Sequence, residues 1–207
     1  MEEVLDVYEQ PYDPQRPQIC LDERPCQLIG DVVMPIPMKP GQVKRQDSYY
    51  KRNGTCCIMI AFEPLAGRRI IEVKERRTKK DYAKFMKKVE QTYRKAEKIV
   101  LVQDNLNTHN PSSFYETFSP EKAFRLSQRF QMIYTPKKAS WLNMAEIELS
   151  ALSKQCLDRR IGDIETFSKE VGAWANQRNR KKASVSWQFT KNVARDKLNR
   201  HYNLIKN

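Results

Sequence analysis

The chain has 207 residues, enough for one substantial buried core, and its longest apolar run, Cys56–Phe62, is far shorter than the roughly 20 residues that cross a bilayer. The acidic start at Met1–Val4 has no signal-peptide pattern, so we expect a cytoplasmic protein without a membrane partner. Lysine and arginine number 38 against 25 acidic residues, and the formal net charge of +13 favours a polyanionic partner, in particular nucleic acid.

The first third of the chain predicts an arm followed by antiparallel strands. Residues 1–17 have little apolar periodicity and three prolines, which indicates an arm or linker rather than a packed element. Prolines and a glycine within 35–41 predict a loop, and Asn53–Gly54 predicts a tight turn before the next strand. The expected strands are Ile19–Asp22, Gln27–Val33 (short or at a sheet edge), Thr55–Phe62 and Arg69–Val73.

The rest of the chain predicts alternating helices and strands. Thr78 followed by Asp81 is a capping signature for a helix whose apolar positions run from Tyr82 to Tyr93, and Ser119–Pro120 begins a second helix. A helix between two buried strands forms a crossover, which implies that those strands are parallel. The expected later elements are strands Ile99–Val102 and Phe130–Tyr134 and helices over residues 120–128, 142–158 and 163–179.

This order of elements matches an α/β, ribonuclease-H-like mixed sheet, with three antiparallel strands, then parallel strands, and flanking helices. In that fold the first and fourth strands lie side by side. We expect the domain to span residues 18–180, followed by a basic C-terminal tail over 181–207. Basic residues are concentrated between Lys74 and Lys98, a segment with eleven basic and only four acidic residues, and again from Arg178 to Arg200.

Acidic residues stand at three places where structure alone seldom requires them. Asp22 ends the apolar run Ile19–Leu21, and Asp104 follows the buried run Ile99–Val102. The loop after a buried parallel strand is where an open α/β sheet binds ligands, although either aspartate could be an ordinary turn residue. A third acid lies near the start of the helix 142–158. Oxygen ligands suit Mg²⁺, and paired Mg²⁺ ions on a basic scaffold suggest phosphodiester chemistry on nucleic acid.

The third acid is Glu146 or Glu148, and helical periodicity does not choose between them. The two glutamates fall on opposite flanks of the apolar stripe of their helix, each roughly 70–90° from its centre. We expect one of the two to be an ordinary solvated acid. The stripe consists of Leu142, Ala145, Leu149, Leu152 and Cys156.

Four segments of the chain form an ordered set of motifs, from about residue 17 to the C-terminus. They are Ile19–Glu23, Tyr50–Thr55, Val102–Asn105 with Thr108–His109, and Ala139–Glu146. The set resembles that of bacterial insertion-sequence transposases, specifically the mariner-like branch of the DDE superfamily, although Met144 stands where the family often has proline. The resemblance implies that Asp22, Asp104 and Glu146, rather than Glu148, bind the catalytic metals. The implied cofactor is Mg²⁺, which Mn²⁺ can replace.

The resemblance also implies an activity and its partners. A DDE transposase catalytic domain cuts DNA strands at the ends of its element and transfers them into target DNA. One metal would deprotonate the attacking water or DNA 3′-hydroxyl, and the other would stabilise the leaving oxygen. The implied partners are double-stranded DNA, at both the element ends and the target, and a second copy of the chain in an active homodimer.

The resemblance leaves the front of the chain unexplained. Such transposases usually carry helix-turn-helix modules before the catalytic domain, whereas here the first catalytic strand begins almost at once. We therefore expect a truncated copy, the second frame of a split gene, or a domain served by a separate helix-turn-helix polypeptide. Two other functions stay open: a ribonuclease-H-like nuclease, which would cut without joining DNA ends, and a non-enzymatic DNA-binding remnant, which would show no saturable metal binding.

Polar residues around the acids supply further candidates. Asn105 and His109 are expected to orient a metal ligand or the scissile phosphate, although His109 could equally be a turn histidine bonded to the backbone. Four basic residues near the ends of predicted elements are expected to contact DNA phosphates beside the site, although each could be solvated surface. They are Lys51, Arg52, Lys137 and Lys138.

Overall fold

The computed structural model describes residues 1–199, and its centre is a five-stranded mixed sheet in the order β3-β2-β1-β4-β5. The β1–β2 and β2–β3 pairs are antiparallel, whereas the β1–β4 and β4–β5 pairs are parallel. The strands are β1 (Gln18–Asp31), β2 (Tyr50–Glu63), β3 (Arg68–Lys74), β4 (Ile99–Gln103) and β5 (Phe130–Tyr134). The predicted ribonuclease-H-like order, with the first and fourth strands side by side, is confirmed.

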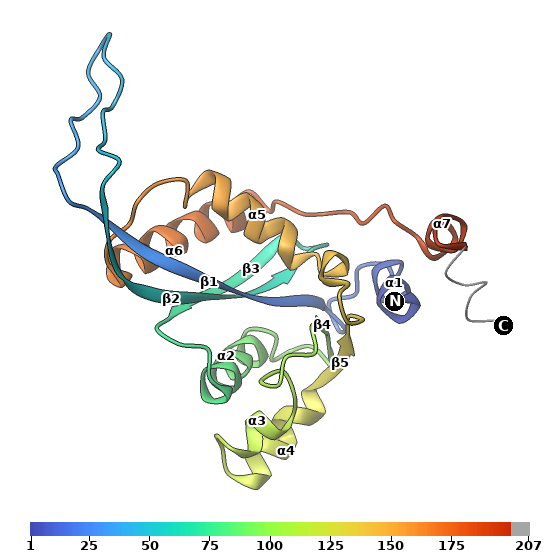
Figure 1. The fold of residues 1–207 in the computed structure, drawn as a ribbon. Coiled ribbons are helices and arrows are strands. Elements are labelled where there is room, and N and C mark those ends of the chain that lie inside the picture. The colour runs from blue at the N-terminus through green and yellow to red at the C-terminus, as the bar shows by residue number, and fades with distance from the viewer. Residues whose placement is uncertain (200–207) are drawn as a thin grey trace.

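Helices cover both faces of this sheet, with α2, α3 and α4 on one face and α5 and α6 on the other (Figure 1). Within residues 1–199, no helix is both long enough and apolar enough to span a membrane. The helices are α1 (Glu2–Tyr8), α2 (Lys79–Thr92), α3 (Ser112–Tyr115), α4 (Pro120–Arg129), the 3₁₀ turn η1 (Ser140–Leu142), α5 (Ala145–Gln155), α6 (Ile164–Arg180) and α7 (Lys191–Lys197).

Alternation along the central strand divides the core into two layers. Cys20 belongs to the apolar cluster shared with α5 and α6, whereas the next residue, Leu21, belongs to the cluster shared with α2. Successive side chains of a strand point to opposite faces of the sheet. Asp22 therefore faces the α5 side of the sheet, and Glu23 faces the α2 side.

The N-terminal residues do not form the predicted arm. Helix α1 packs on the domain with Val4 and Leu5 fully buried, and the Tyr8 hydroxyl donates a hydrogen bond of 2.8 Å to the carbonyl oxygen of Leu142. The helix has only seven residues, fewer than the windows over which helical periodicity can be recognised. The expectation of an arm or linker was therefore wrong for residues 1–8, whereas residues 9–16 are exposed and lie outside the helices and strands.

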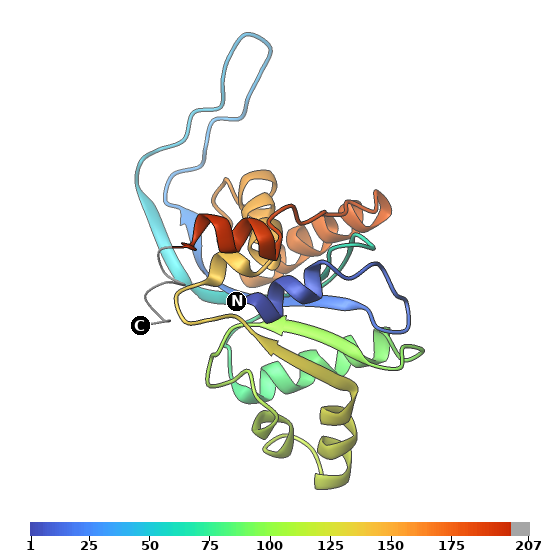
Figure 2. The ribbon, with the colours of Figure 1, turned by 90° about the vertical axis from the view of Figure 1, so that its right-hand side faces the viewer.

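The predicted turn at Asn53–Gly54 is also wrong, because both residues lie inside β2. Gly54 has a φ of +123°, a backbone conformation that favours glycine, and it pairs with Leu28 just before the register of β1 and β2 shifts. A β-bulge and a turn both favour glycine, so the sequence signal was ambiguous. The actual connection is the long excursion over residues 32–49, which projects from the sheet (Figures 1 and 2).

The C-terminal segment is more structured than the predicted polar tail. Val185, Trp187 and Phe189 pack against the main apolar cluster, and the Trp187 ring lies 5.3 Å from that of Tyr8, measured between centroids. Helix α7 follows and contacts α1. Arg200 and the rest of the predicted tail lie outside the described residues.

Candidate active site

The two aspartates come from neighbouring parallel strands. Asp22 lies within β1, not at its end as predicted, and Asp104 directly follows β4. Cys20 pairs with Val102 in the β1–β4 register, so two further residues along each strand bring Asp22 beside Asp104. Neighbouring strands lie about 4.8 Å apart. The sheet itself therefore places the two aspartates at neighbouring positions on adjacent strands.

Glu146 reaches the same region from the opposite side. It lies in the first turn of α5 and, with Asp22 and Arg24, lines an open cavity of about 470 Å³ between β1 and α5. Burial, with smaller contributions from the charges of Glu146 and Asp104, raises the pKa of Asp22 to about 6, although the backbone N–H of Glu23 that donates to its carboxylate opposes the rise. The three acids thus share one electrostatic environment.

Asn143 fixes the start of α5 against β1. Its side-chain amide donates to the carbonyl oxygen of Leu21 at 2.7 Å, and its amide oxygen accepts from the backbone N–H of Ala145 at 3.1 Å. Leu21 is the residue before Asp22, so this one side chain links the strand that carries Asp22 to the helix that carries Glu146. The Tyr8 hydroxyl holds the preceding residue, Leu142. Asn143 belongs to the motif Ala139–Glu146, but its role was not predicted from the sequence.

The structure separates the two glutamates of α5. Glu146 is exposed at the cavity, whereas the Glu148 side chain is fully buried and forms ion pairs with Arg69 at 2.5 Å and Arg178 at 2.7 Å. Burial would raise the pKa of Glu148, but the hydrogen bonds and charges of the two arginines outweigh it and lower the pKa. The expectation that the acid without a metal-binding role would be an ordinary solvated one is wrong for Glu148, which is buried and paired with two arginines.

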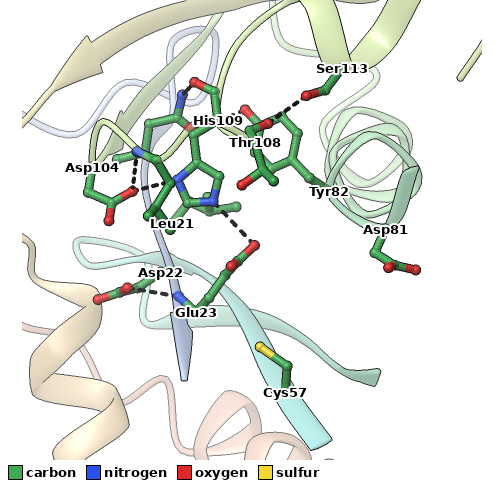
Figure 3. Close-up of polar contacts among 12 residues, drawn as sticks. Leu21, Asp22, Glu23, Cys57, Asp81, Tyr82, Asp104, Thr108, His109 and Ser113 are labelled. Carbon is green, nitrogen blue, oxygen red and sulfur yellow. Dashed lines mark hydrogen bonds and ion pairs between the residues drawn. The ribbon is translucent and has the colours of Figure 1, made fainter. Parts of the chain in front are cut away.

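His109 connects Asp104 to a second, buried carboxylate (Figure 3). Its Nδ1 lies 2.6 Å from Asp104 Oδ1, and its Nε2 lies 3.2 Å from Glu23 Oε1. Burial alone would lower the pKa of His109, but its hydrogen bonds and charge interactions with Asp104 and Glu23 raise the pKa to about 9. His109 is therefore an imidazolium at neutral pH, with both ring N–H groups donating to carboxylates. In return, it holds the pKa of Asp104 below its ordinary value, despite the opposing effect of burial.

Three of the other predicted residues, Asn105, Lys137 and Lys138, lie in the loops that follow β4 and β5. The Asn105 side chain donates to the carbonyl oxygen of Thr135 at 2.7 Å, which ties the loop after β4 to the end of β5. Lys137 and Lys138 are exposed in the loop that follows, at the same edge of the sheet as Asp104. These three residues thus lie at the edge of the sheet that also carries Asp104, and the Asn105 side chain makes its contact to the backbone.

Lys51 and Arg52 do not lie beside the acids, contrary to expectation. Asp22 pairs with Ile60 of β2, whereas Arg52 pairs with Ile29. Eight residues of extended strand separate Ile60 from Arg52, which corresponds to about 26 Å. Both basic residues are exposed at the base of the excursion 32–49. We expected these two residues beside the site because they precede a predicted turn, and that turn is absent.

The donor set at this edge fits a hard divalent cation. Oxygen atoms of carboxylates are the ligands that Mg²⁺ and Mn²⁺ prefer. Burial is the main cause of the raised pKa of Asp22, and the charges of Glu146 and Asp104 add to it, which a bound cation would offset. Among residues 1–199, no three His, Cys, Asp or Glu side chains already form a metal-binding group. Mutual repulsion of the acids opposes such a cage, and Asp104 is turned toward His109.

The sequence and the fold of the chain both resemble those of known proteins. The sequence profile of the DDE superfamily endonucleases matches residues 17–168, which is most of the chain. No curated protein matches the sequence at a significant level. The chain therefore belongs to the DDE superfamily endonucleases.

Solved structures of the Mos1 transposase share the fold. A Mos1 mariner paired end complex with Mn aligns with a TM-score of 0.56 and 13% identity, covering 88% of this chain and 55% of that one. The paired-end complex with left transposon end aligns with a TM-score of 0.57, 14% identity and coverage of 88% and 58%. The Mos1 strand transfer complex aligns with a TM-score of 0.56 and 14% identity, covering 88% of this chain and 58% of that one. The chain thus spans under three-fifths of the Mos1 chains it matches.

Proposed function

We propose that this chain is the catalytic domain of a transposase that cuts DNA strands and joins the ends it frees to other DNA. The observation that supports the proposal most is the raised pKa of Asp22 on β1, to which the charges of Asp104, after the adjacent parallel strand β4, and Glu146, on α5, both contribute. Family membership as a DDE endonuclease and the shared fold with Mos1 complexes support it. The alternative of Glu148 is disfavoured, because two arginines already neutralise its carboxylate.

The chain's own residues define what the site does. Asp22, Asp104 and Glu146 would hold divalent cations, Mg²⁺ or Mn²⁺, which when bound activate the attacking oxygen and stabilise the leaving one at phosphorus. Asp22 must lose its proton to act as a ligand, and its pKa of about 6 leaves it ionised at neutral pH. Asn143 sets the distance between the strand and the helix that carry two of these acids.

Double-stranded DNA is the proposed substrate, both as the end to be cut and as the target to be joined. The net charge of +13 provides a sequence-independent attraction to phosphates. Lys137 and Lys138 lie at the edge of the sheet that holds Asp104 and are the proposed phosphate contacts nearest to it. A homodimer, with end recognition by a separate helix-turn-helix polypeptide, is the proposed active assembly in the cytoplasm.

The proposal is tested with the purified chain, a supercoiled plasmid and a labelled duplex with a free 3′-hydroxyl, with Mg²⁺ or Mn²⁺ present. We expect metal-dependent nicking and joining of the duplex to the plasmid. Asp104→Asn should reduce both by at least about 100-fold, because one metal ligand loses its charge, while a gel shift shows DNA affinity unchanged.

Asp158→Asn is the matched control, because Asp158 is an exposed aspartate beyond the end of α5. It should nick and join DNA at the rate of the unmodified chain. Normal cutting by Asp104→Asn would contradict the assignment of the site. Cutting without any joined product would favour a nuclease over a transposase. The absence of both cutting and saturable metal binding would leave DNA binding as the only activity.

A further inference from the structure

The buried carboxylate behind the proposed metal site has no role in the function described so far. The Glu23 side chain is 1% exposed, and its Oε1 lies 3.2 Å from His109 Nε2. Glu23 Oε2 is buried without a hydrogen-bond partner. A buried charged oxygen left unpaired is costly, so a purely structural role would be poorly served by glutamate at this position.

The position of Glu23 follows from its neighbour in the strand. Asp22 faces the cavity beside α5, and because side chains alternate along β1, Glu23 points to the opposite face of the sheet. There it meets His109, from the loop after β4, as Figure 3 shows. Asp22 and Glu23 therefore lie on opposite faces of the sheet at the proposed metal site.

His109 is held too firmly to adjust to Asp104. Its ring lies against Tyr82, with 4.9 Å between centroids. Its carbonyl oxygen accepts hydrogen bonds of 3.0 Å from the side chains of Gln103 and Tyr134. Only 1% of the side chain is exposed. With the backbone, the ring and Nε2 all fixed, Nδ1 presents its N–H in one direction, toward Asp104.

Asp104 is the member of this chain of contacts that reaches solvent. Its side chain is 38% exposed, and its Oδ1 accepts from His109 at 2.6 Å and from the backbone N–H of Leu106 at 3.2 Å. Two donors on one oxygen fix the plane of the carboxylate. A ligand whose orientation is fixed in advance binds a metal more tightly than one that must be ordered on binding.

We propose that Glu23 is a positioning residue, which orients the proposed metal ligand Asp104 through the His109 ring. This inference rests on the proposed function, since it assigns Glu23 a role toward a cation at Asp104. Residues that hydrogen-bond to a ligand from behind typically change metal affinity by 10- to 100-fold when they are removed.

The test measures Mn²⁺ affinity by titration calorimetry of the full chain, without DNA. Glu23→Ala removes the acceptor for His109 Nε2, and we expect its affinity for Mn²⁺ to fall by about 10-fold or more. Glu23→Gln keeps an acceptor oxygen in the same place, so we expect it to retain most of the affinity. His109→Ala should fall at least as far as Glu23→Ala.

Glu63→Ala is the matched control for loss of a buried carboxylate. Glu63 is 3% exposed and accepts a hydrogen bond of 2.8 Å from the Tyr93 hydroxyl, at the C-terminal end of β2 and apart from the contacts of His109. Thermal melting should show Glu63→Ala destabilised as Glu23→Ala is, while its Mn²⁺ affinity stays unchanged. A purely structural role for Glu23 would make the two variants alike in Mn²⁺ binding as well.

Asp104→Asn separates failure of this inference from failure of the proposed function. If Asp104→Asn binds Mn²⁺ as the unmodified chain does, the metal site itself is wrongly assigned. If Asp104→Asn loses affinity while Glu23→Ala keeps it, the metal site stands and the role of Glu23 is refuted. If Glu23→Gln proves as weak as Glu23→Ala while both remain folded, positioning by a hydrogen bond is refuted.

Discussion

Two clusters of charged side chains, each with one glutamate of α5, differ in whether their carboxylates are paired with positive charge. At the acid edge, formed by Asp22, Asp104 and Glu146, three acids share one environment, and only Asp104 has a cationic partner among the contacts described. In the Glu148 ion-pair centre, formed by Glu148, Arg69 and Arg178, one buried acid faces two guanidinium groups. The carboxylate of Glu148 is already compensated by positive charge, whereas the edge accumulates negative charge.

The difference teaches which acid of α5 stabilises the fold and which is available for chemistry. Glu146 and Glu148 are two residues apart, so a helix rotates them by about 200° relative to each other. One of them reaches the cavity and the other reaches the gap between β3 and α6. The following predictions test this contrast in stability and in activity.

The largest expected effect on stability comes from breaking the Glu148 ion-pair centre. Glu148→Ala leaves the fully buried Arg69 guanidinium without its carboxylate, which should lower the free energy of unfolding by about 3–5 kcal/mol. Denaturant unfolding measures it. A loss below about 1 kcal/mol would show that the pair is solvated and that the contrast with Glu146 is wrong.

The matched change at the acid edge should leave stability intact and remove activity. Glu146→Gln alters an exposed side chain, so its free energy of unfolding should stay within about 0.5 kcal/mol of the unmodified chain. DNA nicking should fall by at least about 100-fold, since a proposed metal ligand is lost. Comparable nicking by Glu146→Gln and the unmodified chain would sink its assignment as a ligand.

A pH-dependent effect is expected at Asp22. Its pKa rises from 3.8 in the unfolded chain to about 6 in the folded one, so the folded state holds the proton more tightly and loses stability as pH rises from about 4 through 6. Asp22→Asn removes this penalty. Without metal, it should be more stable than the unmodified chain by about 1–3 kcal/mol at pH 7.5, and equally stable at pH 4. Denaturant unfolding of both proteins at the two pH values measures this difference in stability. The same difference at pH 4 and at pH 7.5 would contradict the raised pKa of Asp22.

The smallest effect is expected at the support beneath α5. Tyr8→Phe removes the hydrogen bond to the carbonyl oxygen of Leu142, which should lower the free energy of unfolding by about 1 kcal/mol. Mn²⁺ affinity should change by less than about threefold, because Asn143 still links α5 to β1. A larger loss of affinity than of stability would place α1 among the elements that shape the acid edge.

The sequence predicted the sheet order and most elements because their signals are local. The capping box at Thr78 and Asp81 starts α2 as predicted, and the apolar stripe of α5 is buried along its length. The signals failed where one residue type serves two purposes. Gly54 signalled a turn but occupies a bulged strand.

The candidate site could be predicted only in part. A carboxylate after a buried strand is a local signal, so Asp104 was within reach, and family resemblance singled out Glu146 over Glu148. The partners of Glu148 and Glu23 come from residues 30 or more positions away, and no periodicity indicates such contacts. Strand alternation next to Asp22 was the one available hint that Glu23 would face the back of the site.

The central claim is that Asp22, Asp104 and Glu146 hold divalent cations together, and anomalous diffraction from crystals of the chain soaked in Mn²⁺ tests it most directly. The account predicts anomalous peaks in contact with carboxylate oxygens of these three residues, and their absence in the same soak of Asp104→Asn. Mn²⁺ bound elsewhere, with no peak at this edge of the sheet, would contradict it.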